Sequence, residues 1–184
     1  MSINGLTLQS GIGALPFVPL NQEMMAFKAA PVVDVKLWPV SAGAKSEIFG
    51  NNKNIRFKGH LFVTSQRLLF LNSDESNAVH NLVILHRQLT LAKEEVSPIA
   101  LVMPWFGTNS LVFEFKILPE QSLNNGPWLD NAYTWRCELT LEKRSRDVSD
   151  LFQLHDSIKS ALASNAVGAR AEEEEEEPLP EYVP

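Results

Sequence analysis

The residue types most often used in catalysis are few in this chain and do not form a recognisable set. Cys137 lies in an alternating apolar stretch beside Trp135 and Leu139, which predicts a buried, inert thiol rather than a nucleophile. No phosphate-binding loop, nucleophile elbow or dinucleotide fingerprint occurs. We therefore expect a protein that is not an enzyme and that needs no cofactor or metal. The histidines also lack the repeated spacing of metal ligands; they are His60, His80, His86 and His155.

The clearest recognition motif lies in residues 178–184, Pro-Leu-Pro-Glu-Tyr-Val-Pro. Leu179–Tyr182 matches LPxY, a close variant of the PPxY sequence that WW domains bind. Because proline fixes φ at about −65°, Pro178 and Pro180 favour an extended polyproline II ridge before a partner arrives. Pro180 would fit between groove aromatics, and Tyr182 would fill a second pocket with its hydroxyl hydrogen-bonded. The predicted WW-binding residues are Pro178, Leu179, Pro180 and Tyr182.

The formal net charge of −6 belongs to the C-terminal residues rather than to the whole chain. Seven of the 22 acidic residues and none of the 16 basic ones lie in residues 171–184, so the rest is nearly neutral. That body lacks the basic stripe that direct nucleic-acid binding needs. The run Glu172–Glu177 has two interpretations: a solvated spacer for the motif, or a charge that steers a basic partner surface.

Alternating apolar and polar residues predict a series of strands. Residues 33–39 alternate as a half-buried strand that ends at Pro39. Residues 59–72 contain two apolar runs around a short Thr-Ser-Gln turn, which predicts a hairpin. Further strand-like runs occupy residues 81–91, 99–103 and 110–118, and a long loop is expected over 118–131. The most regular strand is 132–141, whose inward face is predicted to be Tyr133, Trp135, Cys137, Leu139 and Leu141.

After Asp147 the apolar period changes to three and four, which predicts an amphipathic helix that fades near Ser164. Asp147 is the expected N-cap, and Asp150 places negative charge in the first turn. The predicted apolar stripe consists of Val148, Leu151, Phe152, His155, Ile158 and Leu162. Several antiparallel strands followed by one C-terminal helix predict a mainly β fold, a barrel or two orthogonal sheets capped by the helix.

Two segments resemble a known family. In the hairpin the matching positions are Gly59, the apolar residues 61–63, Thr64, Arg67, Phe70 and Leu71. This pattern resembles the hairpin signature of GRAM domains, which have the pleckstrin-homology fold. Residues 104–115, PWFGTNSLVFEF, resemble the P-x-F-x-x-N-x-x segment of the WW-domain-binding protein 2 family through Pro104, Phe106 and Asn109. The resemblance covers residues 20–162, and animal family members carry several PPxY motifs where this chain has one LPxY.

The resemblance implies an adaptor for WW-domain proteins, either ubiquitin ligases of the HECT type or transcriptional coactivators, with a cytoplasmic and nuclear distribution. It also implies three parts of the chain. These are an irregular leader over 1–20, a GRAM domain over 21–164 and a disordered acidic tail over 165–184. Trp105 and Phe106 are expected to pack into the domain, with an interaction surface as the alternative.

An alternative function also follows from the resemblance. Pleckstrin-homology-like folds often hold inositol phosphates with basic residues near an opening hairpin, which would make this protein a peripheral membrane module. Arg56 and Lys58 flank Phe57, so an ordinary outward strand face explains them equally well. The candidate lipid-binding residues are Lys53, Arg56, Lys58 and Arg67.

The cellular compartment is predicted from the single cysteine and the first residues. A lone cysteine forms no internal disulfide, so a reducing, intracellular setting is expected. No basic residue precedes Lys28, and Pro16 and Pro19 interrupt the mildly apolar start. Neither a signal peptide nor a membrane span of about 20 apolar residues is therefore expected. Ser2 in place of glycine argues against N-myristoylation.

Overall fold

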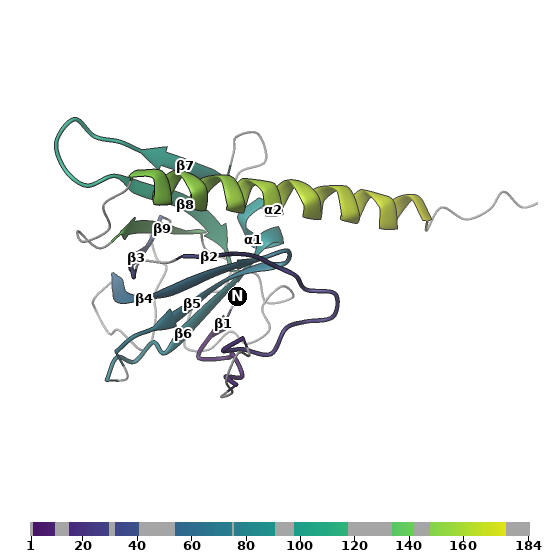
Figure 1. The fold of residues 1–184 in the computed structure, drawn as a ribbon, viewed down its shortest axis with the longest axis horizontal. Coiled ribbons are helices and arrows are strands. Elements are labelled where there is room, and N and C mark those ends of the chain that lie inside the picture. Colours follow the sequence, from purple (N-terminus) through teal and green to yellow (C-terminus); the bar gives the residue numbers. More distant parts are fainter. Residues whose placement is uncertain are drawn as a thin grey trace, which may run out of the picture.

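The computed structural model describes residues 2–9, 15–29, 32–40, 54–74, 76–90, 98–117, 134–141 and 148–175 (Figure 1). The predicted loop 118–131, Lys53, Asp147, Tyr133 and the WW-binding motif lie outside these residues. Within them, no helix is both long enough and apolar enough to cross a bilayer.

The described residues form one antiparallel sheet in which the strands follow the order β1-β6-β5-β4-β3-β9-β8-β7. Strand β2 lies outside this order and pairs with the C-terminal end of β4. Two helices, α1 (His86–Thr90) and α2 (Val148–Glu175), accompany it. The strands are β1 (Ser2–Ile3), β2 (Met25–Lys28), β3 (Val33–Pro39), β4 (Ile55–Thr64), β5 (Arg67–Asn72), β6 (Asn81–Leu85), β7 (Ile99–Val102), β8 (Ser110–Lys116) and β9 (Thr134–Leu141).

Two meanders, β3 to β6 and β7 to β9, are joined where β3 pairs with β9 along its whole length. Helix α2 packs against β2, β4, β7 and β8 and so covers the core that the curved sheet surrounds (Figure 1). The predicted mainly β class with a C-terminal capping helix is confirmed, and this order of parts is consistent with a pleckstrin-homology-like sheet.

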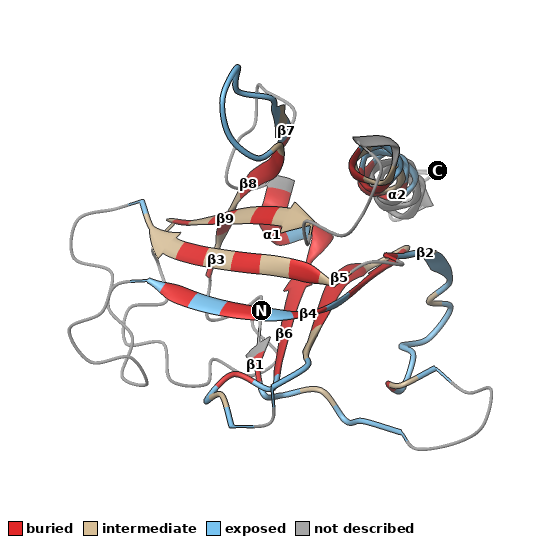
Figure 2. Ribbon diagram, turned by 60° about the vertical axis from the view of Figure 1, so that its left-hand side comes forward, coloured by how far each residue is buried: buried red, intermediate tan, exposed pale blue. Residues whose placement is uncertain are grey.

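Strands β3 and β9 show the alternation that their sequences predict. In β9 the side chains of Trp135, Cys137 and Leu139 are buried, and the residues between them are partly exposed. Strand β3 alternates in the same way, as the red and tan bands in Figure 2 show. One face of this half of the sheet therefore packs on the core, and the other faces solvent.

Strands β5 and β6 are buried on both faces, which explains their unbroken apolar runs (Figure 2). One face contributes to the main core. On the other face, Phe62, Leu69 and Val83 form a second cluster with Phe17, which is fully buried. The leader expected to be irregular thus supplies a strand, β1, and the aromatic cover of the outer sheet face.

The strand predicted over 81–91 ends early, at Leu85, and α1 follows it. The reason is a capping interaction that the apolar pattern does not reveal. The Gln88 side-chain oxygen accepts a hydrogen bond from the Leu85 N–H at 3.0 Å, as in a capping box. Its amide nitrogen donates to the Lys116 carbonyl at 2.9 Å and ties the turn to β8.

Helix α2 differs from its prediction in two respects. It continues to Glu175 instead of fading near Ser164. Its buried stripe is also rotated: Phe152 is 40% exposed, and Leu154 is buried in its place. The sheet covers only a narrow stripe of the helix surface. The row of apolar side chains that contains Leu154 is covered, and Phe152 on the neighbouring row is not. The buried residues are Leu151, Leu154, Ile158, Ala161 and Leu162.

Gly59 lies in β4 between its two neighbouring strands. It pairs with Val33 of β3 on one side and with Asn72 of β5 on the other. A Cβ atom at this position would overlap the Leu71 carbonyl oxygen and come within 2.7 Å of its carbonyl carbon. Both are backbone atoms of a central strand, so no flexible side chain can move aside. Glycine is therefore required by the close approach of two backbones.

We expect Gly59→Ala to lower the free energy of unfolding by about 2–3 kcal/mol, because the added methyl group forces β4 and β5 apart. Urea denaturation followed by tryptophan fluorescence measures this loss. His60→Ala, at the exposed neighbouring position, is the matched control and should change stability by no more than about 0.5 kcal/mol. Equal midpoints for the two variants would contradict the close approach.

Candidate functional site

Arg67 is buried inside the domain and does not belong to an exposed basic surface. Its side chain is 3% exposed, and the Glu23 side chain beside it is 1% exposed. The guanidinium binds both carboxylate oxygens, with Nε 2.7 Å from Oε1 and Nη2 2.8 Å from Oε2. Nη2 also donates to the Val18 carbonyl at 3.0 Å. Arg67 therefore does not lie on the exposed basic surface that the lipid-binding prediction requires, because its side chain is buried and its Nε and Nη2 groups have partners within the protein.

Thr64 completes this buried arrangement, which we call the Glu23 clamp (Glu23, Thr64 and Arg67). The Thr64 hydroxyl donates to Glu23 Oε1 at 2.6 Å and accepts the N–H groups of Gln66 and Arg67, which form the β4–β5 turn. The Leu20 N–H donates to Glu23 Oε2 at 2.7 Å. The clamp thus joins the leader to the turn of the predicted hairpin.

The clamp also determines the protonation state of Glu23. Burial alone raises the pKa of this carboxyl group, but the hydrogen bonds from Arg67, Thr64 and Leu20 hold the pKa below its ordinary value of 4.5. The clamp therefore contributes stability above pH 4.5 and loses it as the pH falls through the folded-state pKa.

His86 is buried close to the clamp, at the start of α1. Its backbone N–H donates to the Gln66 carbonyl at 3.0 Å, and its side chain has neither ring nitrogen hydrogen-bonded within the described residues. Burial lowers the pKa of His86 to about 4, and the Ser65 backbone and the Glu23 charge oppose this only in part. The imidazole is therefore neutral at physiological pH.

Arg56 and Lys58 lie on β4 beside an open surface depression. Arg56 Nε is 3.3 Å from the Asp34 carboxylate, and the Arg56 side chain is 70% exposed. A hydrogen bond from Ser76 lowers the pKa of Asp74, so this carboxylate also presents negative charge to the depression. Among the described residues, this surface therefore carries both positive and negative side chains. The lining residues are Asp34, Arg56, Phe57, Lys58, Asn72, Asp74 and Asn77.

Trp105 and Phe106, which were expected to pack into the domain, are 99% and 94% exposed. They lie in the loop between β7 and β8, and the expectation of packing is wrong. Gly107 follows them with a φ of 125°, a conformation that residues with a Cβ rarely adopt. Both aromatic side chains therefore lie in solvent instead of in the core.

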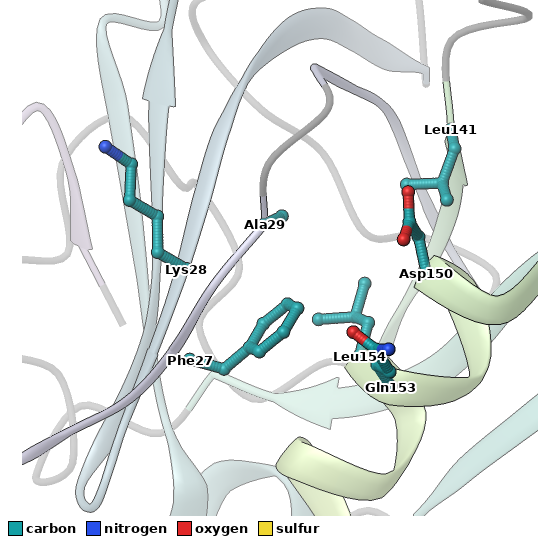
Figure 3. Close-up of a pocket in the computed structure, with 7 residues that line it drawn as sticks. All are labelled: Phe27, Lys28, Ala29, Leu141, Asp150, Gln153 and Leu154. Atoms are coloured by element: carbon teal, nitrogen blue, oxygen red, sulfur yellow. The ribbon is translucent and has the colours of Figure 1, made fainter. Parts of the chain in front are cut away.

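A small pocket lies between β2 and the first turns of α2 (Figure 3). The Phe27 ring and Leu154 face one another across it, and the Lys28 ammonium points away from it. Its mainly apolar lining does not bring together groups for acid–base or nucleophilic chemistry. The lining residues are Phe27, Lys28, Ala29, Leu141, Asp150, Gln153 and Leu154.

Cys137 is fully buried, as predicted, and burial raises the pKa of its thiol well above the ordinary value. Such a thiol is a poor nucleophile. Among the described residues, no group of three or more His, Cys, Asp or Glu side chains is arranged to hold a metal ion.

Comparison with known proteins gave no match, either to a protein-family model or to a curated protein. The GRAM resemblance therefore stays a prediction based on the residues that carry it, and the sheet and capping helix provide the structural context.

Sequence reasoning missed Glu23 as the partner of Arg67. A signal was present, because Glu23 is the only acidic residue among residues 1–33. An isolated acid in an apolar leader and an arginine inside an apolar hairpin are each expensive to bury alone. Pairing the two residues offsets the free-energy cost of burying each charge. Which residues pair is decided by the tertiary structure, so the sequence pattern does not reveal it.

We expect Arg67→Ala to destabilise the domain by about 3–5 kcal/mol, because it leaves the Glu23 carboxylate buried without its cation. The double variant Arg67→Met/Glu23→Leu should recover much of this loss, since no unpaired charge then remains. Thermal and urea unfolding measure both. Arg56→Ala, which breaks an exposed ion pair, should cost at most about 1 kcal/mol, and an equal cost at both arginines would contradict the clamp.

His86 should make stability fall as the pH decreases from 6.5 toward 4. The unfolded chain binds a proton at His86 in this range and the folded chain does not, so the loss is about 3 kcal/mol. Urea unfolding of His86→Leu at several pH values should show a flatter profile between these limits. His80→Leu, at an exposed position, is the control and should keep the wild-type slope; parallel profiles for all three proteins would refute the role of His86.

Proposed function

We propose that this protein is a non-enzymatic adaptor that binds WW-domain proteins through Pro178, Leu179, Pro180 and Tyr182. The observation that carries the proposal is the LPxY motif itself, which follows a run of six glutamates. Two prolines reduce the ordering cost of docking, and the tyrosine supplies one large side chain for a groove.

The course of α2 supports the proposal. Among the α2 residues whose burial is described, the last buried one is Leu162, and the helix continues to Glu175. At 1.5 Å per residue this extension is about 20 Å long, and Figure 1 shows it leading away from the sheet. A helix that leads the chain away from the sheet before the motif begins suits a segment that a WW domain must reach.

The glutamates at the end of α2 support both interpretations of the acidic run. Glu172–Glu175 occupy the last turn, where the helix dipole disfavours negative charge, and no basic residue compensates there. A run of like charges stays solvated, which suits a spacer. The same charge attracts a basic partner surface and would make the association rate depend on salt.

The proposed partners come from the family resemblance: WW-containing ubiquitin ligases of the HECT type or WW-containing transcriptional coactivators, in the cytoplasm and nucleus. Phosphoinositide binding through the basic residues is less well supported, since Arg67 is buried and Arg56 pairs with Asp34.

We expect Tyr182→Ala to abolish binding of the full chain to WW domains, because it removes the side chain that fills the second pocket. Titration calorimetry against a panel of isolated WW domains measures this. The unfolding midpoint should not change, since the described core uses no residue of the motif. Glu181→Ala changes the variable position of LPxY and is the matched control, with binding retained. Undiminished binding by Tyr182→Ala would contradict the proposal.

A further inference from the structure

The β7–β8 loop presents a continuous apolar tip that the adaptor function does not use. Besides Trp105 and Phe106, Met103 is 55% exposed and Val102 is 40% exposed. Pro104 lies between them and is also exposed. We call this segment, Val102–Phe106, the apolar tip. Exposed apolar residues scattered singly are ordinary, but a contiguous group of this kind indicates a contact surface.

The tip is convex and carries no charge. From Ser97 to Phe113 the sequence contains no ionisable side chain, so the hairpin that carries the tip supplies none of the charged rim that many protein contact surfaces have. The two strands that support it, β7 and β8, pair from Ile99–Phe113 to Val102–Ser110. The tip therefore stands on a regular hairpin, held to the core by Ile99, Leu111 and Phe113.

The area of the tip distinguishes between a protein partner and a lipid partner. A large aromatic side chain buries about 150–250 Å², so the whole tip offers on the order of 500 Å². A stable protein interface needs about 800 Å² from each partner, with a matching shape. A bilayer requires no shape complementarity, and tryptophan is enriched at the level of the lipid headgroups. Insertion into the interfacial region also removes both aromatic rings from water.

We propose that the apolar tip inserts into the interfacial region of a phospholipid bilayer, with Trp105 and Phe106 as the anchoring side chains. The contact needs no headgroup-specific pocket, so it differs from phosphoinositide binding at the β3–β5 depression. A single small tip gives a reversible attachment. The adaptor would thereby spend part of its time at a membrane surface while its C-terminal motif remains free for a partner.

The test is co-sedimentation of the full chain with vesicles of phosphatidylcholine, alone and mixed with phosphatidylserine. We expect the wild type to pellet with the vesicles, and Trp105→Ala/Phe106→Ala to reduce the partition coefficient on the order of 100-fold. Leu8→Ala/Met24→Ala removes exposed apolar side chains elsewhere and is the matched control, with binding unchanged. Arg56→Ala/Lys58→Ala tests the depression and should leave binding to pure phosphatidylcholine intact.

A second measurement separates insertion from loss of folding. Trp105→Phe keeps an apolar tip, so it should still pellet, but the blue shift of tryptophan fluorescence on adding vesicles should largely disappear. Failure of the wild type to pellet, or equal pelleting by the Trp105→Ala/Phe106→Ala variant, would overturn the proposal. So would analytical ultracentrifugation showing a lipid-free dimer that the same variant dissociates, because the tip would then bind a second copy. WW binding through Tyr182 should be the same in all these variants. The proposal of membrane insertion and the proposal of WW binding can therefore be refuted independently.

Discussion

The buried ion pair between Glu23 and Arg67 is the interaction on which the outer half of the sheet depends. Burying either charge alone would cost several kcal/mol, so the two residues must fold together. Their pairing holds residues 18–23 against the β4–β5 turn and places Phe17 over the outer sheet face. Without that cover, Phe62, Leu69 and Val83 would be exposed to water. The ion pair therefore connects a local turn to the burial of a whole sheet face.

The described core and the segments proposed for recognition occupy separate parts of this chain. The core consists of inward side chains from both meanders and one stripe of α2, and the described part of it includes neither the apolar tip nor residues beyond Leu162. Trp105 and Phe106 are both almost fully exposed, so the described core does not depend on their side chains. The side chains of Cys137 and His86 also belong to the interior: Cys137 is buried, and His86 is neutral and enclosed.

Local patterns predicted most of the fold. The period of two in β3 and β9, the short polar turn after Thr64 and the change of period before α2 each identify an element, because side-chain direction follows from backbone geometry alone. The predictions fail at positions where a contact with a residue distant in the sequence determines the local structure or the burial. Gln88 ends β6 by capping α1 and bonding to β8, and the position of the sheet determines that Leu154 rather than Phe152 is buried. The exposure of Trp105 is likewise a property of the folded chain that hydrophobicity does not predict.

The sequence by itself determined the class of fold, the neutral body with its acidic end, and the LPxY motif, since each depends on residues that are neighbours in the chain. The tertiary structure alone decided which charged and aromatic residues are accessible. Arg67 follows the turn of a hairpin and looks like part of a basic surface, but its partner Glu23 lies 44 residues away and makes it an interior residue. Whether a side chain is accessible depends on which other segments of the chain pack over it. Pairing between residues distant in the sequence produces no periodic pattern from which it could be predicted.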